Sequence, residues 1–132
     1  MATQSNGRVV LVTPDRVLAD VTAFRLNLLG FQPIVYDDAD AALAGLEHDS
    51  AGLLMVDLRL EDGQAWRLLD AVSRNETTAA LPVLVLSTDA ELDTVQKAFR
   101  AGARDFLVLP YDPLALDRKV EQLVAEWEAV GT

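Results

Sequence analysis

The sequence predicts an α/β fold in which a five-stranded parallel sheet is covered by helices on both faces. Short apolar runs rich in valine and leucine recur about 20–30 residues apart, and stretches with apolar residues every three or four positions lie between them. The runs are typical of strands buried on both faces, and the stretches are typical of amphipathic helices. Strands that alternate with helices form a parallel sheet between two helical layers.

The composition argues against several classes of binding partner and of metal or redox site. A chain of 132 residues has the size of one domain, so we expect a single domain over residues 1–132. The net charge of -10 argues against nucleic acid or a membrane surface as a partner, because both need a basic surface. The lack of cysteine excludes disulfides and thiolate metal sites. Without a membrane-length apolar window or a signal peptide, the expected location is the cytoplasm.

The first strand and helix follow from turn and cap signals. Residues 1–7 are polar and are expected to be a disordered lead-in to a strand over residues 8–13. Thr13 can cap a helix, and Pro14 fits its first position because the missing N–H costs nothing there. Gly30 is expected to end this helix. Four apolar residues at spacings of four, three and four predict its inward face: Val17, Val21, Phe24 and Leu28.

The second and third units have similar signals. A short strand at residues 33–36 is followed by Asp37 or Asp38, either of which can cap a helix over residues 39–47. The third strand, residues 52–57, is a run of four apolar side chains that ends in the carboxylate of Asp57. A loop at residues 58–64 then leads to a helix over residues 65–74.

The last two units complete the pattern. The fourth strand covers residues 82–87, with a proline at its first position, where a strand tolerates one. A helix over residues 91–101 carries Leu92, Val95 and Phe99 at helical spacing, and a strand at residues 104–109 follows. The final helix opens at Pro113, and its apolar stripe is Leu116, Val120, Leu123 and Trp127.

Right-handed crossovers and five strands favour a flavodoxin-like, doubly wound sheet with strand order 2-1-3-4-5. Ligands of such sheets bind beyond the carboxyl ends of the strands. The residues at the ends of strands one, three and five are Thr13, Asp57 and Leu109. A functional site is therefore expected around Asp57.

Six stretches reveal a family resemblance: VVLVTPD, GF at Gly30-Phe31, DLRLEDG, PVLVLST, AGARDFLVLP and YDP. At these separations the chain resembles the receiver domain of bacterial response regulators, which belong to two-component signalling. The resemblance implies that Asp57 is the phosphoacceptor, to which a histidine kinase phosphorelay transfers a phosphoryl group. It also implies that Ser87 bonds the phosphoryl oxygens and that Phe106 is a switch residue that reports the phosphorylation state.

Three positions depart from the family pattern. Thr13 and Pro14 stand where the resemblance places an acidic pair that holds Mg²⁺, and Leu109 stands where it places a lysine. Mg²⁺ needs carboxylate and phosphate oxygens, so Asp57 and Asp15 could form no more than a weak site. Phosphoryl transfer depends on charge neutralisation, and both neutralising groups are missing. We therefore expect an atypical receiver, or pseudo-receiver, with weak or absent phosphorylation and no cofactor.

The expected function is contact with a partner signalling protein rather than catalysis. The resemblance places the partner face on the fourth helix, fifth strand and fifth helix, including Asp93, Lys97, Arg100, Arg104 and Phe106. The same face could also hold a second copy of the chain, and the sequence does not choose between the two. The alternative is a small-molecule-binding or enzymatic flavodoxin-like domain. The chain has no glycine-rich phosphate loop, which disfavours that alternative.

Some residues also have plainer interpretations. Ser87 could be a turn hydroxyl that bonds its own backbone. Phe106 could be an ordinary core aromatic. Leu109 could fill the space of a lysine stem or form part of an apolar partner surface. The only histidine, His48, is expected to be exposed and without a chemical role.

Overall fold

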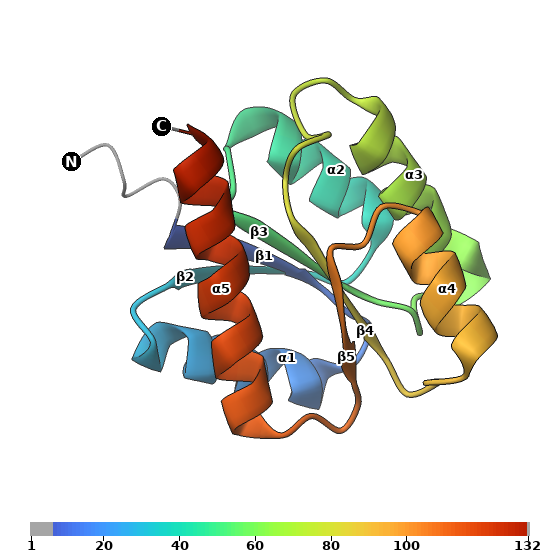
Figure 1. Ribbon diagram of the computed structural model, residues 1–132, viewed down its shortest axis with the longest axis horizontal. Helices are drawn as coiled ribbons and strands as arrows, with labels where there is room; N and C mark the ends of the chain where they lie inside the picture. The colour runs from blue at the N-terminus through green and yellow to red at the C-terminus, as the bar shows by residue number, and fades with distance from the viewer. Residues whose placement is uncertain (1–6, 132) are drawn as a thin grey trace.

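A computed structural model describes residues 7–131, with side chains up to residue 127, and confirms the predicted fold class (Figure 1). The lead-in at residues 1–6 lies outside the described residues. The five strands are β1 (Arg8–Val12), β2 (Gln32–Tyr36), β3 (Leu53–Asp57), β4 (Val83–Ser87) and β5 (Asp105–Val108). The helices are α1 (Arg16–Leu28), α2 (Ala39–His48), α3 (Gln64–Arg74), α4 (Leu92–Arg100) and α5 (Pro113–Gly131), and a short 3₁₀ turn, η2 (Glu61–Gly63), precedes α3.

All strand pairs are parallel, and the order in the sheet is β2-β1-β3-β4-β5. In Figure 1, α1 and α5 lie on one face of the sheet, and α2, α3 and α4 lie on the other. Alternate residues of β3 face the two layers: Leu53 and Met55 pack toward α1 and α5, whereas Leu54 and Val56 pack toward α2 and α3. By the same alternation Asp57 faces α1, which places its carboxylate on the α1 side of the crevice.

The start of α1 differs from the prediction. Asp15, rather than Thr13, is the N-cap, and its carboxylate accepts a hydrogen bond from the backbone N–H of Leu18 at 3.0 Å. Pro14 therefore precedes the helix instead of occupying its first position. The reason is that Thr13 is still paired with the sheet, since its N–H donates to the carbonyl of Tyr36 at 3.1 Å.

The inward face of α1 was predicted wrongly. The side chains that pack on the sheet are Ala19, Thr22 and Leu26. The four residues at heptad-like spacing point to solvent instead, with exposed fractions of 71% for Val17, 55% for Val21, and 66% for Phe24 and Leu28. Small side chains let α1 lie close to the sheet, and its larger apolar side chains are left on the outer surface. We call Val17, Val21, Phe24 and Leu28 the α1 stripe.

The helix α4 shows the same discrepancy in a weaker form. Only Ala98 of this helix is buried, while Leu92 and Phe99, two of the three apolar residues that the sequence places at helical spacing, are exposed. Leu92 has 69% of its surface exposed. The predicted apolar stripe of α5 is buried at Leu116, Val120 and Leu123 and partly buried at Trp127. Within residues 7–131, no helix is long and apolar enough to cross a membrane.

Candidate functional site

Asp57 and Thr13 meet at the carboxyl ends of β3 and β1, as the strand order predicts. Both side chains are buried, and Asp57 has 0% of its surface exposed. The hydroxyl of Thr13 donates a hydrogen bond to Oδ2 of Asp57 at 2.7 Å. Because β1 and β3 are neighbours at the point where the strand order reverses, this pair lies where an open α/β sheet binds its ligands.

The side chain of Arg59 folds back onto the carboxylate of Asp57. Its Nη2 donates to Oδ2 at 2.8 Å, and its Nε lies 3.1 Å from Oδ1 and 3.2 Å from Oδ2. The backbone N–H of Arg59 also donates to Oδ1, at 2.9 Å. Each oxygen of Asp57 therefore accepts at least two hydrogen bonds from the chain itself. The hydrogen bond to Asp57 raises the pKa of Arg59 above its usual value.

Asp15 lies on the other side of the same guanidinium. Its Oδ2 is 3.3 Å from Nη1 of Arg59, and its backbone N–H donates to the hydroxyl of Thr13 at 3.1 Å. The pKa of Asp15 is lowered, chiefly by the hydrogen bond from the Leu18 N–H and further by the charge of Arg59. Asp15 thus caps α1 and also pairs with a cation in the crevice.

Ser87 lies across the crevice and bonds its own turn. Its hydroxyl donates to the backbone carbonyl of Asp89 at 3.0 Å and accepts from the backbone N–H of Asp89 at 2.9 Å. On β4, Val83 and Val85 face the α2–α3 layer, so Ser87 continues the set that points away from α1. The hydroxyl makes the turn contact that its plainer interpretation predicts.

The other positions singled out in the sequence are spread around this centre. Leu109 is buried, with 7% exposed, and packs with residues of α1 and α5. It therefore fills the core, and the idea that it covers a partner is wrong. Phe106 is partly buried against the opposite core layer, and Pro14 is exposed. Within the part of the chain with described side chains, no group of three or more histidine or acidic side chains could hold a metal ion.

The model of one protein family matches residues 9–121, and its description is response regulator receiver domain. This chain belongs to that family. The match covers β2 to β5 and all of β1 except Arg8, and it reaches into α5. The receiver family, the two-component class and the flavodoxin-like topology predicted from the sequence are thereby confirmed.

Two proteins illustrate what this receiver domain resembles in sequence. The transcriptional regulatory protein PhoB of Escherichia coli is 24% identical over 117 residues, which are 89% of this chain and 51% of PhoB. An uncharacterized 14.6 kDa protein of Leptolyngbya boryana is 30% identical over 122 residues, covering 92% of this chain and 93% of that protein. The chain therefore spans about half the length of PhoB but nearly all of the small cyanobacterial protein.

Solved structures show the same fold. A CheY-like response regulator receiver domain protein from Methanospirillum hungatei superposes with a TM-score of 0.84 at 23% identity, over 92% of this chain and 96% of that one. The chemotaxis response regulator CheY4 of Vibrio cholerae superposes with a TM-score of 0.83 at 19% identity, over 89% of this chain and 98% of that one.

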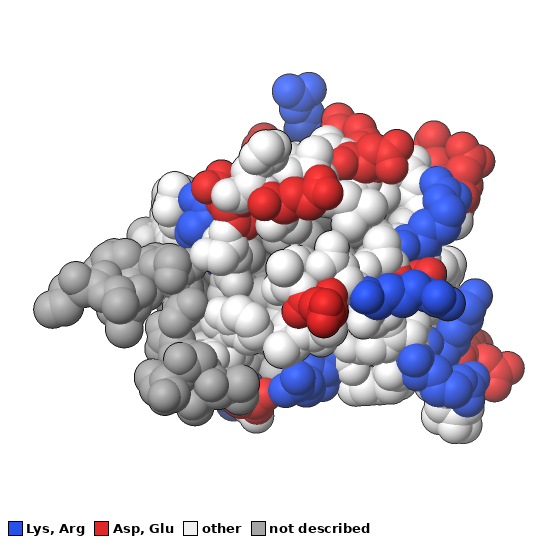
Figure 2. All heavy atoms as spheres, turned by 90° about the horizontal axis from the view of Figure 1, so that it is seen from above, with Lys and Arg blue, Asp and Glu red and all other residues white. Residues whose placement is uncertain are grey.

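The predicted partner face of the receiver domain is exposed and charged. Asp93, Lys97, Arg100 and Arg104 are all exposed on α4 and next to β5. Lys97 lies 4.1 Å from the centre of the Trp66 ring, and Arg104 pairs with Glu126 at 3.3 Å. Figure 2 shows Lys and Arg side chains gathered toward the side of the molecule where α3 and α4 lie, interspersed with Asp and Glu. Exposed apolar side chains, including Phe99 and Val108, accompany these charges.

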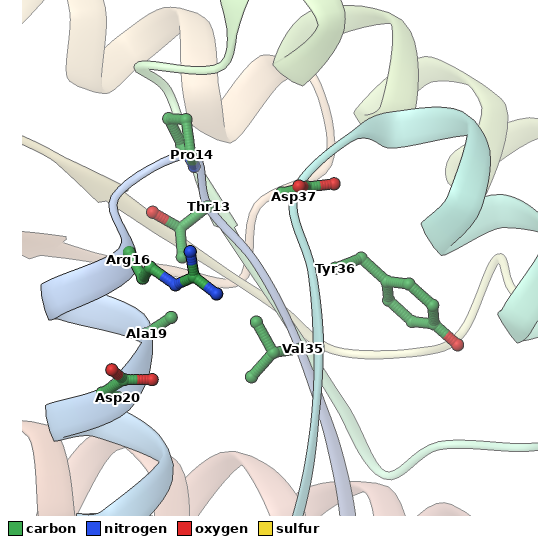
Figure 3. Close-up of a pocket in the computed structure, with 8 residues that line it drawn as sticks. All are labelled: Thr13, Pro14, Arg16, Ala19, Asp20, Val35, Tyr36 and Asp37. Atoms are coloured by element: carbon green, nitrogen blue, oxygen red, sulfur yellow. The ribbon is translucent and has the colours of Figure 1, made fainter.

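A hollow of about 500 Å³ lies between α1 and the outer edge of β2, beside the crevice. Figure 3 shows the guanidinium of Arg16 reaching from α1 into this hollow, near Val35. Asp20 and Asp37 also line it, so its walls carry both signs of charge. The hollow is on the β1–β2 side of the sheet and adjoins the crevice at Thr13, which lines the hollow and donates to Asp57.

Sequence reasoning missed two features of this receiver domain. The first is the side chain of Arg59, which bonds both oxygens of Asp57. A basic residue two positions after a buried carboxylate was the available signal. The second is the exposure of the α1 stripe. Its spacing was recognised, but the spacing alone does not tell which of two possible faces packs on the sheet.

Proposed function

We propose that this receiver domain acts in a two-component system by docking partner signalling proteins, with phosphorylation of Asp57 weak or absent. The observation that carries the proposal is the set of groups around Asp57. They are a hydroxyl from Thr13 and a guanidinium from Arg59, and both oxygens of the carboxylate are already bonded. The retained aspartate supports a receiver role, and its surroundings argue against fast phosphotransfer.

The chemistry of phosphoryl transfer supports weak or absent phosphorylation of Asp57. Phosphoryl transfer is accelerated mainly by positioning the reactants and by neutralising the charge of the transferred group. A phosphoryl group on Asp57 would find no lysine at position 109, where a buried leucine packs in the core instead. The hydroxyl of Ser87 is engaged with the backbone of Asp89. A phosphorylated state would therefore gain few of the charge-assisted hydrogen bonds that stabilise such a state.

The exposed apolar side chains support a role in docking partner signalling proteins. The α1 stripe lies opposite the face of α1 that packs on the sheet, and its spacing is that of a seam between two helices. A second apolar group, Leu92, Phe99 and Val108, lies on α4 and β5 among the charged residues of the predicted partner face. Contiguous exposed apolar surface of this kind marks protein contacts. A histidine kinase, another helical signalling protein or a second copy of the chain are the partners that the family suggests.

Phosphorylation is tested with a small phosphodonor, acetyl phosphate, in the presence of Mg²⁺ and with intact mass as the readout. We expect the wild-type protein to be labelled at least about tenfold more slowly than the Thr13→Asp/Pro14→Asp/Leu109→Lys variant, because that variant restores both neutralising groups. Asp57→Asn is the control for labelling elsewhere. Wild-type labelling as fast as that of the triple variant would contradict the proposal.

Docking is tested by titrating the helical phosphotransfer domains of candidate histidine kinases into the protein. Phe24→Glu places a charge in the α1 stripe, and Leu92→Glu does the same on α4. We expect one of the two to weaken binding by about tenfold or more, since buried aromatic and apolar anchors dominate interfaces. Arg74→Gln, on the exposed side of α3, is the matched surface control. If neither charged variant changes the affinity, the docking surface lies elsewhere. Self-association, measured by light scattering, separates the homodimer from the other partners.

A further inference from the structure

A single basic side chain joins two carboxylates in the crevice. The guanidinium of Arg59 bonds both oxygens of Asp57 with its Nε and Nη2 atoms and lies 3.3 Å from Asp15 with its Nη1 atom. Asp57 is the last residue of β3, and Asp15 is the N-cap residue of α1. One planar cation therefore connects the floor of the crevice to the first turn of a helix on its rim.

Thr13 closes these contacts into a ring. Its hydroxyl donates to Asp57 at 2.7 Å and accepts from the N–H of Asp15 at 3.1 Å. The ring thus runs from Asp57 to Thr13, then to Asp15, to Arg59 and back to Asp57. Among the described residues, no buried side-chain nitrogen or oxygen is without a hydrogen-bond partner. The polar groups of the crevice are therefore satisfied within the chain.

We propose that the Arg59 guanidinium takes the place of the divalent cation that the family resemblance implies, and that it fixes the start of α1 to Asp57. The inference deepens the proposed function and rests on its account of the crevice. Mg²⁺ is held by oxygen ligands in near-octahedral geometry, usually with carboxylates. Here the residues present do not fit such an ion, because a threonine and a proline replace the acidic pair and Arg59 covers Asp57.

The electrostatics of the ring suit a built-in cation. Isolated buried charges are strongly destabilising, and Asp57 has no exposed surface. Arg59 supplies the opposite charge through a planar fork that matches a carboxylate. The bond to Asp57 raises the pKa of Arg59, so its charge persists through the physiological range. The charge balance of the crevice then does not depend on the concentration of divalent cations, and an entering metal ion would have to displace the guanidinium.

The test is the effect of Mg²⁺ on thermal stability, with no phosphodonor and no partner. Arg59→Gln removes the charge but keeps a polar side chain. We expect this variant to melt about 5–10 °C lower than wild type, because it leaves Asp57 buried without a counter-charge. Millimolar MgCl₂ should restore part of that loss beyond what NaCl of equal ionic strength does. The wild-type melting temperature should show no difference between the two salts.

Two further variants keep the test decisive. Arg74→Gln removes a guanidinium from the exposed Arg74–Asp70 pair and should leave the protein stable and indifferent to Mg²⁺. Arg59→Lys keeps the charge without the fork, so it should melt between wild type and Arg59→Gln with little response to Mg²⁺. If Arg59→Gln does not fold, a melting temperature of wild type or Arg59→Lys that rises in MgCl₂ but not in NaCl of equal ionic strength would overturn the inference.

A wild-type protein that Mg²⁺ stabilises as strongly as it does Arg59→Gln would overturn the inference. So would an Arg59→Gln variant that loses no more stability than Arg74→Gln. Rapid phosphorylation of Asp57 in a protein whose melting temperature ignores Mg²⁺ would overturn only the proposed function.

Discussion

The two sides of the crevice are built differently, although both lie beside buried strands. On the β1–α1 side, Thr13, Asp15 and Arg59 bond one another and Asp57. On the β4–α4 side, the hydroxyl of Ser87 bonds the backbone of its own turn at Asp89, and within the described residues it makes no hydrogen bond to Asp57. The helices on the two sides also differ in how firmly they pack. Three side chains of α1 are buried, whereas only one side chain of α4 is buried.

Contacts with α5 add to the asymmetry. Arg25 of α1 forms a two-pronged pair with Asp117 of α5, at 2.9 and 2.7 Å, and the hydroxyl of Thr22 lies 2.7 Å from that of Tyr111. On the other face, Lys97 of α4 lies over the ring of Trp66 of α3, with its Nζ 4.1 Å from the ring centre. A change at Asp57 is therefore expected to reach α1 directly and α4 only weakly. Four measurements test this difference between the two sides of the crevice.

The largest expected effect comes from matched leucine truncations on the two helices. Leu26→Ala should lower the free energy of unfolding by about 3 kcal/mol, because Leu26 is fully buried and a cavity remains. Leu92→Ala should change it by no more than about 0.5 kcal/mol, since Leu92 is mostly exposed. Chemical denaturation measures both. Equal losses would mean that α4 is held as firmly as α1.

The two hydroxyls of the crevice provide the next comparison. Thr13→Val keeps the shape of the side chain but removes a hydrogen bond to a fully buried carboxylate, so we expect a loss of about 2 kcal/mol. Ser87→Ala removes contacts within one turn and should cost about 1 kcal/mol or less. Amide chemical shifts at Leu18 should move in the first variant only. Shifts at Leu18 in Ser87→Ala would break the contrast.

Hydrogen exchange compares the helices without any substitution. A helix with one buried side chain should open locally at a lower free energy than a helix with three. We expect the amides of α4 to exchange about tenfold or more faster than those of α1, relative to their intrinsic rates. Equal protection along both helices would show that contacts other than side-chain burial hold α4.

The smallest effect concerns acid stability. Hydrogen bonding from Arg25 lowers the pKa of Asp117, and hydrogen bonding from Thr94 lowers that of Asp89. A carboxyl with a depressed pKa in the folded state contributes stability above its unfolded value of 3.8, and this contribution disappears as the pH falls through the folded pKa.

Wild type should therefore lose stability below pH 3.8 more steeply than Asp117→Asn, which lacks the titrating group. Asp89→Asn should make the loss of stability with falling pH less steep by a smaller amount than Asp117→Asn does. The Asp89–Thr94 hydrogen bond joins residues only five positions apart, at the start of α4, whereas the Arg25–Asp117 pair joins two helices. Denaturant midpoints measured at several pH values give the comparison. A greater effect of Asp89→Asn would reverse the predicted order.

Much of the fold could be predicted because strand burial and turn chemistry are local. The run that ends at Asp57, the αL glycine at Gly30 and the proline before β4 each have one good structural interpretation. The inner face of α1 could not be predicted in the same way. Two of its three packing residues, Ala19 and Thr22, are small or polar, and the hydroxyl of Thr22 bonds that of Tyr111. A hydrophobic pattern finds the most apolar face, which here is the outer one.

The site was predictable only where it depends on strand order. Parallel strands bring Thr13 and Asp57 together, so their contact follows from the topology. The direction in which the Arg59 side chain points does not follow from helical or strand periodicity, because Arg59 lies in the turn beyond β3. A buried carboxylate needs a counter-charge, and a search for one within a few residues would have found it.

The α1 stripe has a consequence for large-scale mutagenesis. Within each turn of α1, buried side chains that stabilise the fold alternate with exposed side chains that contribute little to its stability. In a library read by cellular abundance, substitutions at Ala19 and Leu26 should be depleted, while those in the α1 stripe should pass almost unnoticed. Read by signalling output, the same library should lose both sets. The difference between the two readouts would isolate the outer surface of α1 as the place where selection acts on association alone.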